Sequence, residues 1–158
     1  MTIPKKRQRR KEGDLLRIPI DQTWHTYARV LRTPLLAFYD ARTDGDLKPE
    51  EIIRRPILFK LWVMHRATTS GRWRRVAHVP LEPELLEEPT FFKQDPLKPN
   101  KFSLYRGTDE IPATRGQCEG LERAAVWEPE NVEERLRDHY LAKPNKWVKS
   151  LELKASIN

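Results

Sequence analysis

Disulfides and membrane-spanning runs are both missing from this sequence. Cys118 is the single cysteine among 158 residues, so no disulfide can form within the chain, which suits a reducing compartment. The longest apolar runs, at residues 34–39 and 57–64, are far shorter than the roughly 20 residues that span a bilayer. Asp14 and Arg17 interrupt the stretch after the basic N-terminus, unlike a signal peptide. We therefore expect a cytoplasmic protein with no membrane contact.

Recognisable catalytic motifs are also missing. No G-x-S-x-G or phosphate-binding glycine pattern occurs, and no two histidines stand at the spacing of metal ligands. The adjacent Glu119 disfavours a reactive thiolate at Cys118, which we interpret as a structural cysteine. The sequence therefore indicates no catalytic residue, no metal site and no cofactor. The four histidines are His25, His65, His78 and His139.

Positive charge is abundant but unevenly placed. The formal net charge is +7, and residues 1–11 hold six basic residues and no acid. The remaining residues carry 24 basic against 23 acidic side chains, so the body of the protein is close to neutral. We expect residues 1–11 to be a disordered basic leader, because they have no apolar periodicity.

Alternating apolar residues predict a series of strands. Residues 35–40 are too uniformly apolar for a half-exposed strand, which indicates a buried central one. Pro19 cannot donate to a ladder, so it favours an edge position for the first strand. The expected strands are residues 15–20, 25–32, 35–40, 57–67, 73–79 and 101–106.

The pattern changes to a helical period near the C-terminus. Val132, Leu136 and Tyr140 form a stripe that predicts a helix over residues 128–143, and residues 121–127 are weakly helical. Residues 80–100, with five prolines, are expected to form a long ordered loop. Strands grouped before a late helix predict an α+β fold, with a curled antiparallel sheet or small β-barrel of five to six strands capped by the C-terminal helix.

An ordered string of short motifs runs through most of the chain. It comprises Gly13-Asp14, Phe38-Tyr39-Asp40, Gly71-Arg72-Trp73, Phe92-Lys93-Gln94-Asp95, and Gly120-Leu121-Glu122 leading to Val126-Trp127. In this order and spacing the motifs resemble the immunity protein 26 family, from about Lys11 to about Leu151. The resemblance implies a single immunity-type domain over residues 12–158. It also implies a non-catalytic bacterial protein that binds and neutralises a polymorphic toxin encoded nearby.

Binding by occlusion needs a few exposed aromatic or arginine anchors. We expect these to be Trp24 in the first turn, Arg72 and Arg74 near the hairpin, and Phe91 in the proline-rich loop. Asp14 and Asp40 are interpreted as structural residues that cap turns.

Two other functions stay open at this point. The basic run Lys5–Lys11 and the stretch GRWRR at residues 71–75 would suit a small β-barrel that binds nucleic acid. Some members of the resembled family carry a phosphotriesterase-like label, which implies a metal-dependent hydrolase as the third alternative. The immunity interpretation is favoured over both.

Overall fold

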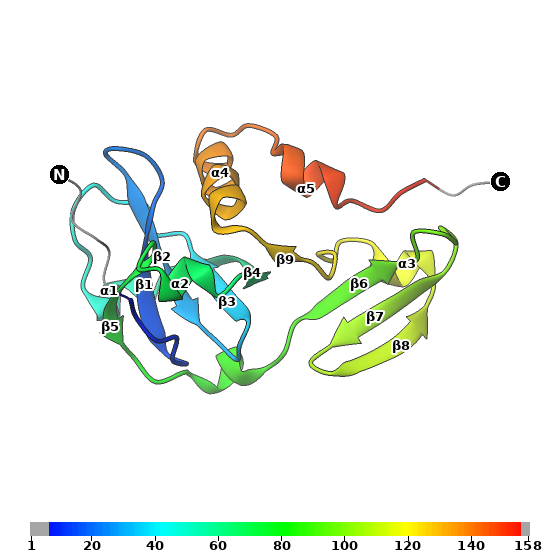
Figure 1. Ribbon diagram of the computed structural model, residues 1–158, viewed down its shortest axis with the longest axis horizontal. Helices are drawn as coiled ribbons and strands as arrows, with labels where there is room; N and C mark the ends of the chain where they lie inside the picture. The colour runs from blue at the N-terminus through cyan, green and yellow to red at the C-terminus, as the bar shows by residue number, and fades with distance from the viewer. Residues whose placement is uncertain (1–6, 156–158) are drawn as a thin grey trace. The chain divides into compact units, whose positions relative to one another are not determined.

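The computed structural model describes residues 7–155, which fall into two units (Figure 1). Unit 1 consists of residues 7–86 and Val126–Lys143, and unit 2 consists of Glu87–Ala125 and residues 144–155. A single immunity-type domain over residues 12–158 stays a prediction.

Unit 1 is built on a six-stranded sheet, counted over the described residues, in the order β5-β1-β2-β3-β4-β9. All pairings are antiparallel except that of β4 with β9. The sheet is curled and does not close into a barrel, which confirms the α+β class and the open form of the predicted sheet. The strands are β1 (Asp14–Pro19), β2 (His25–Val30), β3 (Leu35–Tyr39), β4 (Ile57–Val63), β5 (Arg74–His78) and β9 (Val126–Trp127).

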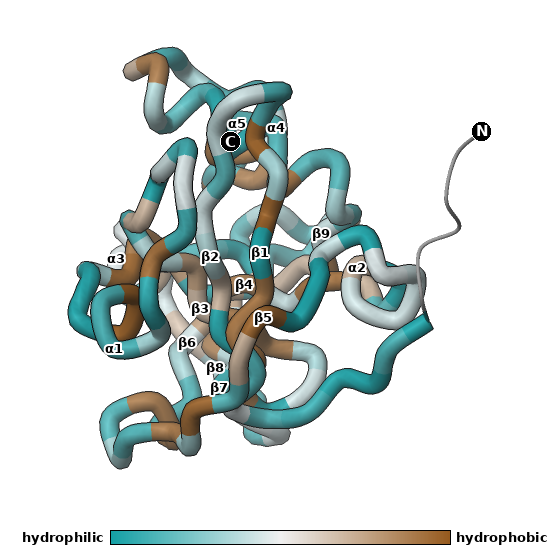
Figure 2. Tube along the Cα trace, turned by 90° about the vertical axis from the view of Figure 1, so that its left-hand side faces the viewer, coloured by the Kyte–Doolittle hydropathy of each residue, from teal (hydrophilic) through white to brown (hydrophobic). Residues whose placement is uncertain are grey.

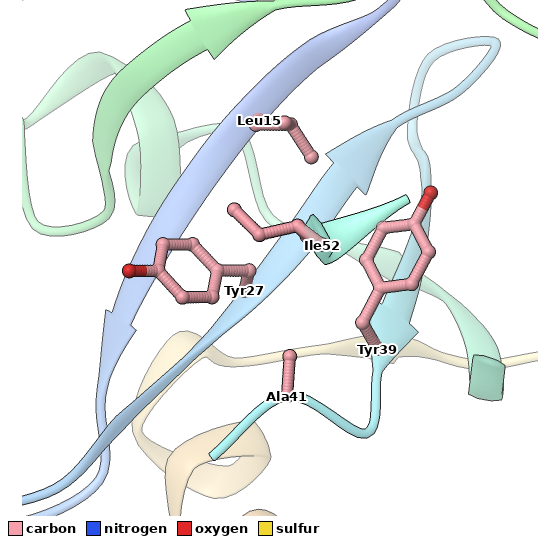
Figure 3. Packing of buried hydrophobic residues seen from close by; sticks show 5 residues of the cluster. All are labelled: Leu15, Tyr27, Tyr39, Ala41 and Ile52. Atoms are coloured by element: carbon pink, nitrogen blue, oxygen red, sulfur yellow. The ribbon is translucent and has the colours of Figure 1, made fainter. Parts of the chain in front are cut away.

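One face of this sheet packs against the short helix α1 (Pro49–Ile52). Figure 3 shows the cluster formed there by side chains from β1, β2, the end of β3 and α1. Every residue of this cluster is at most 2% exposed, which matches the apolar side of alternating strands. Its members are Leu15, Tyr27, Tyr39, Ala41 and Ile52.

The opposite face is covered by α4 (Pro129–Tyr140), the helix expected from the apolar stripe. Val132 and Leu136 are fully buried, and the sheet contributes Phe38, whose ring meets that of Trp73 edge-on at 5.8 Å. With helices on both faces, β3 is buried along its whole length. The continuous apolar run at residues 35–39 is explained by this two-sided burial. Figure 2 shows hydrophobic residues along β1 as well.

The first strand was expected at the edge of the sheet because it contains Pro19, and this expectation is wrong. β1 lies between β5 and β2, but β5 pairs only with the residues from Asp14 to Arg17. Pro19 is opposite His25 of β2 at the very end of the strand. A proline is tolerated inside this sheet because no further strand needs its missing N–H group.

Unit 2 contains a three-stranded antiparallel sheet, β6 (Thr90–Gln94), β7 (Phe102–Arg106) and β8 (Asp109–Ala113), within the described chain. The expectation of a loop throughout residues 80–100 is therefore wrong at β6. Residues 121–127 are not helical, since Val126 and Trp127 form β9 of unit 1. Phe92, Phe102 and Cys118 make the core of unit 2.

The other short helices are divided between the two units. Unit 1 contains α2 (Arg66–Thr69) and η1 (Pro83–Leu86), and unit 2 contains α3 (Arg115–Cys118) and α5 (Lys146–Ser150).

The phenol of Tyr140 ties the end of α4 to the sheet, and it gives unit 1 a pH-dependent contact. Tyr140 Oη donates to Asp40 Oδ1 at 3.0 Å, and burial is the main cause that raises the pKa of Tyr140 to about 12. A raised pKa means that the folded state holds the proton more tightly than the unfolded chain. The stabilisation is therefore complete below pH 10 and is lost as the pH rises towards 12.

We expect the variant Tyr140→Phe to be less stable than the natural chain at pH 8, by about 1 kcal/mol for the lost hydrogen bond. The difference should shrink between pH 10 and pH 12, because only the natural chain has this phenol to ionise. Urea unfolding of both proteins at stepped pH measures the difference. A gap that stays constant from pH 8 to pH 12 would contradict the assignment.

Candidate partner-binding surface

The segment before the first strand is held against unit 1 where the structure describes it. Residues 7–11 form no helix or strand. Gln8 nevertheless donates its side-chain amide to the Trp73 carbonyl and accepts from the Arg75 N–H at 3.1 Å, and Arg10 donates to the carbonyls of Pro34 (2.7 Å) and Val63 (3.2 Å). This part of the expected disordered leader is therefore bonded in place. Lys5 and Lys6 of the basic run lie outside the described residues.

The inward and outward residues of this segment alternate. Gln8 and Arg10 are half-buried, whereas Arg7 and Arg9 are exposed. Burial lowers the pKa of Arg10 to about 10. Residues 7–10 line a pocket of about 650 Å³ together with His65 and Thr69. This pocket was not expected from the sequence, because the polar run at residues 7–11 gives no sign of which side chains face inward.

Strand β5 is an edge of the unit 1 sheet, and Arg74 opens it. The Arg74 side chain is exposed, as the sequence analysis expected. The Gln8 side chain binds the backbone on either side of Arg74, at the Trp73 carbonyl and at the Arg75 N–H. The pairing with β1 skips one residue of β5 between Ala77 and Arg75, which is a β-bulge. Bulges and charges are both common devices at protected sheet edges.

Arg72 is held inside unit 1. Its Nε and Nη2 atoms donate to the carboxylate of Glu133 at 2.7 and 2.8 Å, and these bonds are the main cause that raises the pKa of Arg72. The indole N–H of the fully buried Trp73 donates to the same carboxylate at 2.9 Å. Arg72 therefore links the segment between α2 and β5 to α4. The hairpin expected here is wrong, because β5 pairs with β1 and not with β4. A partner that contacted Arg72 would have to share its guanidinium with Glu133.

Trp24 is half-buried and is presented by a tight turn. Asp21 accepts the backbone N–H groups of Thr23 (2.8 Å) and Trp24 (2.7 Å), and these two bonds are the main causes that lower the pKa of Asp21. The guanidinium of Arg42 lies over the Trp24 ring at 4.6 Å and over the Tyr140 ring at 5.0 Å. Trp24 is thus a preordered aromatic surface group with a cation beside it.

The expected exposure of Phe91 is wrong. Phe91 is 3% exposed and Phe92 is 2% exposed, because both lie on β6 of unit 2 and not in an open loop. The prolines around residues 80–100 obscured a strand of five residues. A binding role for Phe91 stays a prediction, and it would require this buried ring to become accessible.

Asp14 and Asp40 both make structural contacts. Asp14 is 1% exposed, accepts the Lys11 N–H at 3.2 Å, and lies 3.0 Å from Nδ1 of His78. The role of Asp14 as a turn cap stays a prediction, and the contact with Lys11 is compatible with it. Asp40 accepts the Tyr140 hydroxyl, so it also joins α4 to the sheet.

Groups that could support chemistry are sparse among the described residues. Residues 7–155 contain no cluster of three or more histidine, cysteine or acidic side chains able to hold a metal ion. Cys118 is fully buried, and its burial raises the pKa of the thiol. None of the helices described is long and apolar enough to cross a membrane.

Comparison with known proteins adds one match. The model of the family described as immunity protein 26 matches residues 11–103, which is more than half of the chain. No curated protein and no solved structure matches significantly. The matched region begins at Lys11, directly after the bonded residues 7–10, and ends within β7. On this match, the chain belongs to the immunity protein 26 family.

Proposed function

We propose that this protein is a bacterial immunity protein that binds a cognate toxin and neutralises it by occlusion, without catalysis. Family membership is the observation that carries the proposal. Membership supports an immunity role in general, and the partner and the mode of inhibition are inferred from the surface of the protein.

The surface of unit 1 offers anchors of the types that dominate specific interfaces. Trp24 is held by its turn and by Arg42, and Arg74 stands exposed on an edge strand. A stable interface buries about 1,200–2,000 Å² in total and is anchored by a few aromatic or arginine side chains. Contacts of this kind block a toxin by covering its active surface, so no chemical step is required of the immunity protein.

A growth-rescue experiment tests the proposal. The open reading frame immediately upstream is expressed from a tightly controlled promoter, with this chain or with a copy carrying an early stop codon. We expect the neighbour to stop growth and this chain to restore it. The two purified proteins should form a stable complex with a dissociation constant of about 10 nM or tighter.

Variants then separate binding from folding. Trp24→Ala and Arg74→Ala should weaken rescue while leaving the melting temperature close to that of the natural chain, because both side chains reach solvent. Arg54→Ala, another exposed arginine of unit 1, is the matched control and should rescue fully. If a toxic neighbour kills equally with and without this chain, the proposed function is overturned.

A further inference from the structure

The docked segment, residues 7–10, is not explained by family membership. It precedes the matched region, yet its inward residues Gln8 and Arg10 bond to the backbone of unit 1. This docking fixes the direction of Arg7 and Arg9, which face solvent. An ordered display of two arginines costs conformational freedom, which a bound ligand would offset.

No acidic side chain among the described residues forms an ion pair with Arg7, Arg9 or the nearby Arg74. The carboxylates of Glu128 and Glu130 bind Arg66, and Glu133 binds Arg72. In residues 7–155, the side chains of Arg7, Arg9 and Arg74 make no hydrogen bond or ion pair.

Arg10 adds a buried charge to the same group. Its two terminal nitrogens donate to carbonyl oxygens, which are neutral, and its Nε atom is buried with no hydrogen-bond partner among the described residues. Its charge is therefore desolvated without a counter-charge, as its lowered pKa indicates. An anion nearby would relieve that cost.

The pocket gives this positive charge a place to receive a ligand. Its volume of about 650 Å³ is large enough for side chains of another protein, and four of its six lining residues are Arg7, Arg9, Arg10 and the exposed His65. Gln8 also lines it and reaches the backbone on either side of Arg74. We call these five basic residues the cationic edge: Arg7, Arg9, Arg10, His65 and Arg74.

We infer that the cationic edge is a docking surface for an acidic segment of the toxin, whose carboxylates enter the pocket beside Arg7 and Arg9. The inference rests on the proposed function and names the surface that would carry it. Charge complementarity of this kind mainly speeds encounter and selects the partner. It also gives the basic leader a role in a protein whose remaining charge is nearly balanced.

Nucleic acid fits the same surface less well. Proteins that hold single strands combine cations with exposed aromatic rings on which bases stack. Trp73, the aromatic residue next to the cationic edge, is 0% exposed and gives its N–H to Glu133. The surface therefore offers charge without a stacking platform, which favours carboxylates presented by a protein.

The test compares two double charge reversals of equal size. Arg7→Glu with Arg9→Glu alters the cationic edge, and Arg54→Glu with Arg55→Glu alters two other exposed arginines of unit 1. The first probe is the toxin from the adjacent reading frame, which is separated from its complex and refolded. The other probes are a (Glu-Val)₅ peptide, a (Lys-Val)₅ peptide and a 20-nucleotide single-stranded DNA. Binding is titrated at 0.05, 0.15 and 0.5 M NaCl, and the melting temperatures of all variants are recorded.

We expect the first variant to bind the toxin about tenfold or more weakly at 0.15 M NaCl, mainly through a slower association rate. Its deficit should shrink at 0.5 M NaCl, where charges are screened. The control variant should match the natural chain. The natural chain should also prefer (Glu-Val)₅ to (Lys-Val)₅ at 0.05 M NaCl, and the first variant should lose that preference.

The outcomes distinguish the two proposals. Toxin binding that is equal in the natural chain and the first variant overturns the cationic edge and leaves the immunity function standing. Absence of any toxin binding by the natural chain overturns the immunity function and the toxin as the occupant, and the peptide preference then decides whether the cationic edge binds acidic segments. Lack of a preference for (Glu-Val)₅, or DNA binding tighter than peptide binding, overturns the acidic-segment assignment.

Discussion

Replacing Arg29 by methionine should lower the free energy of unfolding by about 3–5 kcal/mol, the cost of breaking a buried ionic network by removing one member. Arg29 is 0% exposed on β2. Its Nη2 atom donates to the carbonyls of Val79 and Pro80, each at 2.6 Å, and Nη1 donates to the Tyr39 hydroxyl at 3.1 Å and to Glu82 at 3.2 Å. Methionine fills part of the volume and satisfies none of these acceptors.

Thermal unfolding gives the measurement. At about 2–4 °C per kcal/mol for a chain of this size, the melting temperature should fall by about 10 °C. Arg54→Met removes an exposed arginine of unit 1 and should change stability by less than about 0.5 kcal/mol. Equal melting temperatures for Arg29→Met and Arg54→Met would show that the buried guanidinium does not hold the segment after β5 to the sheet.

Glu133→Ala is expected to have an effect of similar size on the other face of the sheet, about 3–5 kcal/mol. The Glu133 side chain is 8% exposed and accepts two bonds from Arg72 and one from Trp73. Removing it leaves a buried indole N–H without an acceptor and an arginine without its counter-charge. Both losses act on the contact between α4 and the segment that joins α2 to β5.

A double-mutant cycle with Trp73→Phe isolates one of these bonds. If the indole bond matters, the two substitutions should be non-additive by about 1 kcal/mol or more, because each removes the same contact. Glu12→Ala, an exposed acid of unit 1, is the control and should be nearly neutral. Strict additivity of Glu133→Ala and Trp73→Phe would contradict a shared contact.

Glu133 also bears on function through Arg72. As long as Arg72 is paired with Glu133, little of its charge is free for a partner. Arg74, two residues later, is exposed on the edge strand, and no carboxylate of residues 7–155 pairs with it in this way. Sequence reasoning treated the two arginines alike because both precede or begin the same strand. Only the position of α4 separates them.

Strands and helices with a strong local pattern of apolar residues were predicted well. The apolar run at residues 35–39 became the buried central strand β3, and the stripe Val132, Leu136 and Tyr140 became α4. Two strands beside or containing prolines, β6 and β8, were not expected, because proline forbids one hydrogen bond without forbidding a strand. β6 follows Pro89 directly, and β8 contains Pro112 at an exposed position.

The sequence by itself determined the α+β class, the central strand, the covering helix and the ordered motifs of the immunity protein 26 family. These depend on local periodicity and on residues near one another in the chain. Tertiary structure alone decided that Phe91 is buried, that Arg72 is paired and that residues 7–10 are docked with Arg7 and Arg9 outward. Each of these depends on hydrogen bonds or packing between distant segments, such as Gln8 with Arg75 or Arg72 with Glu133, and polar residues carry no periodic signal that announces such partners.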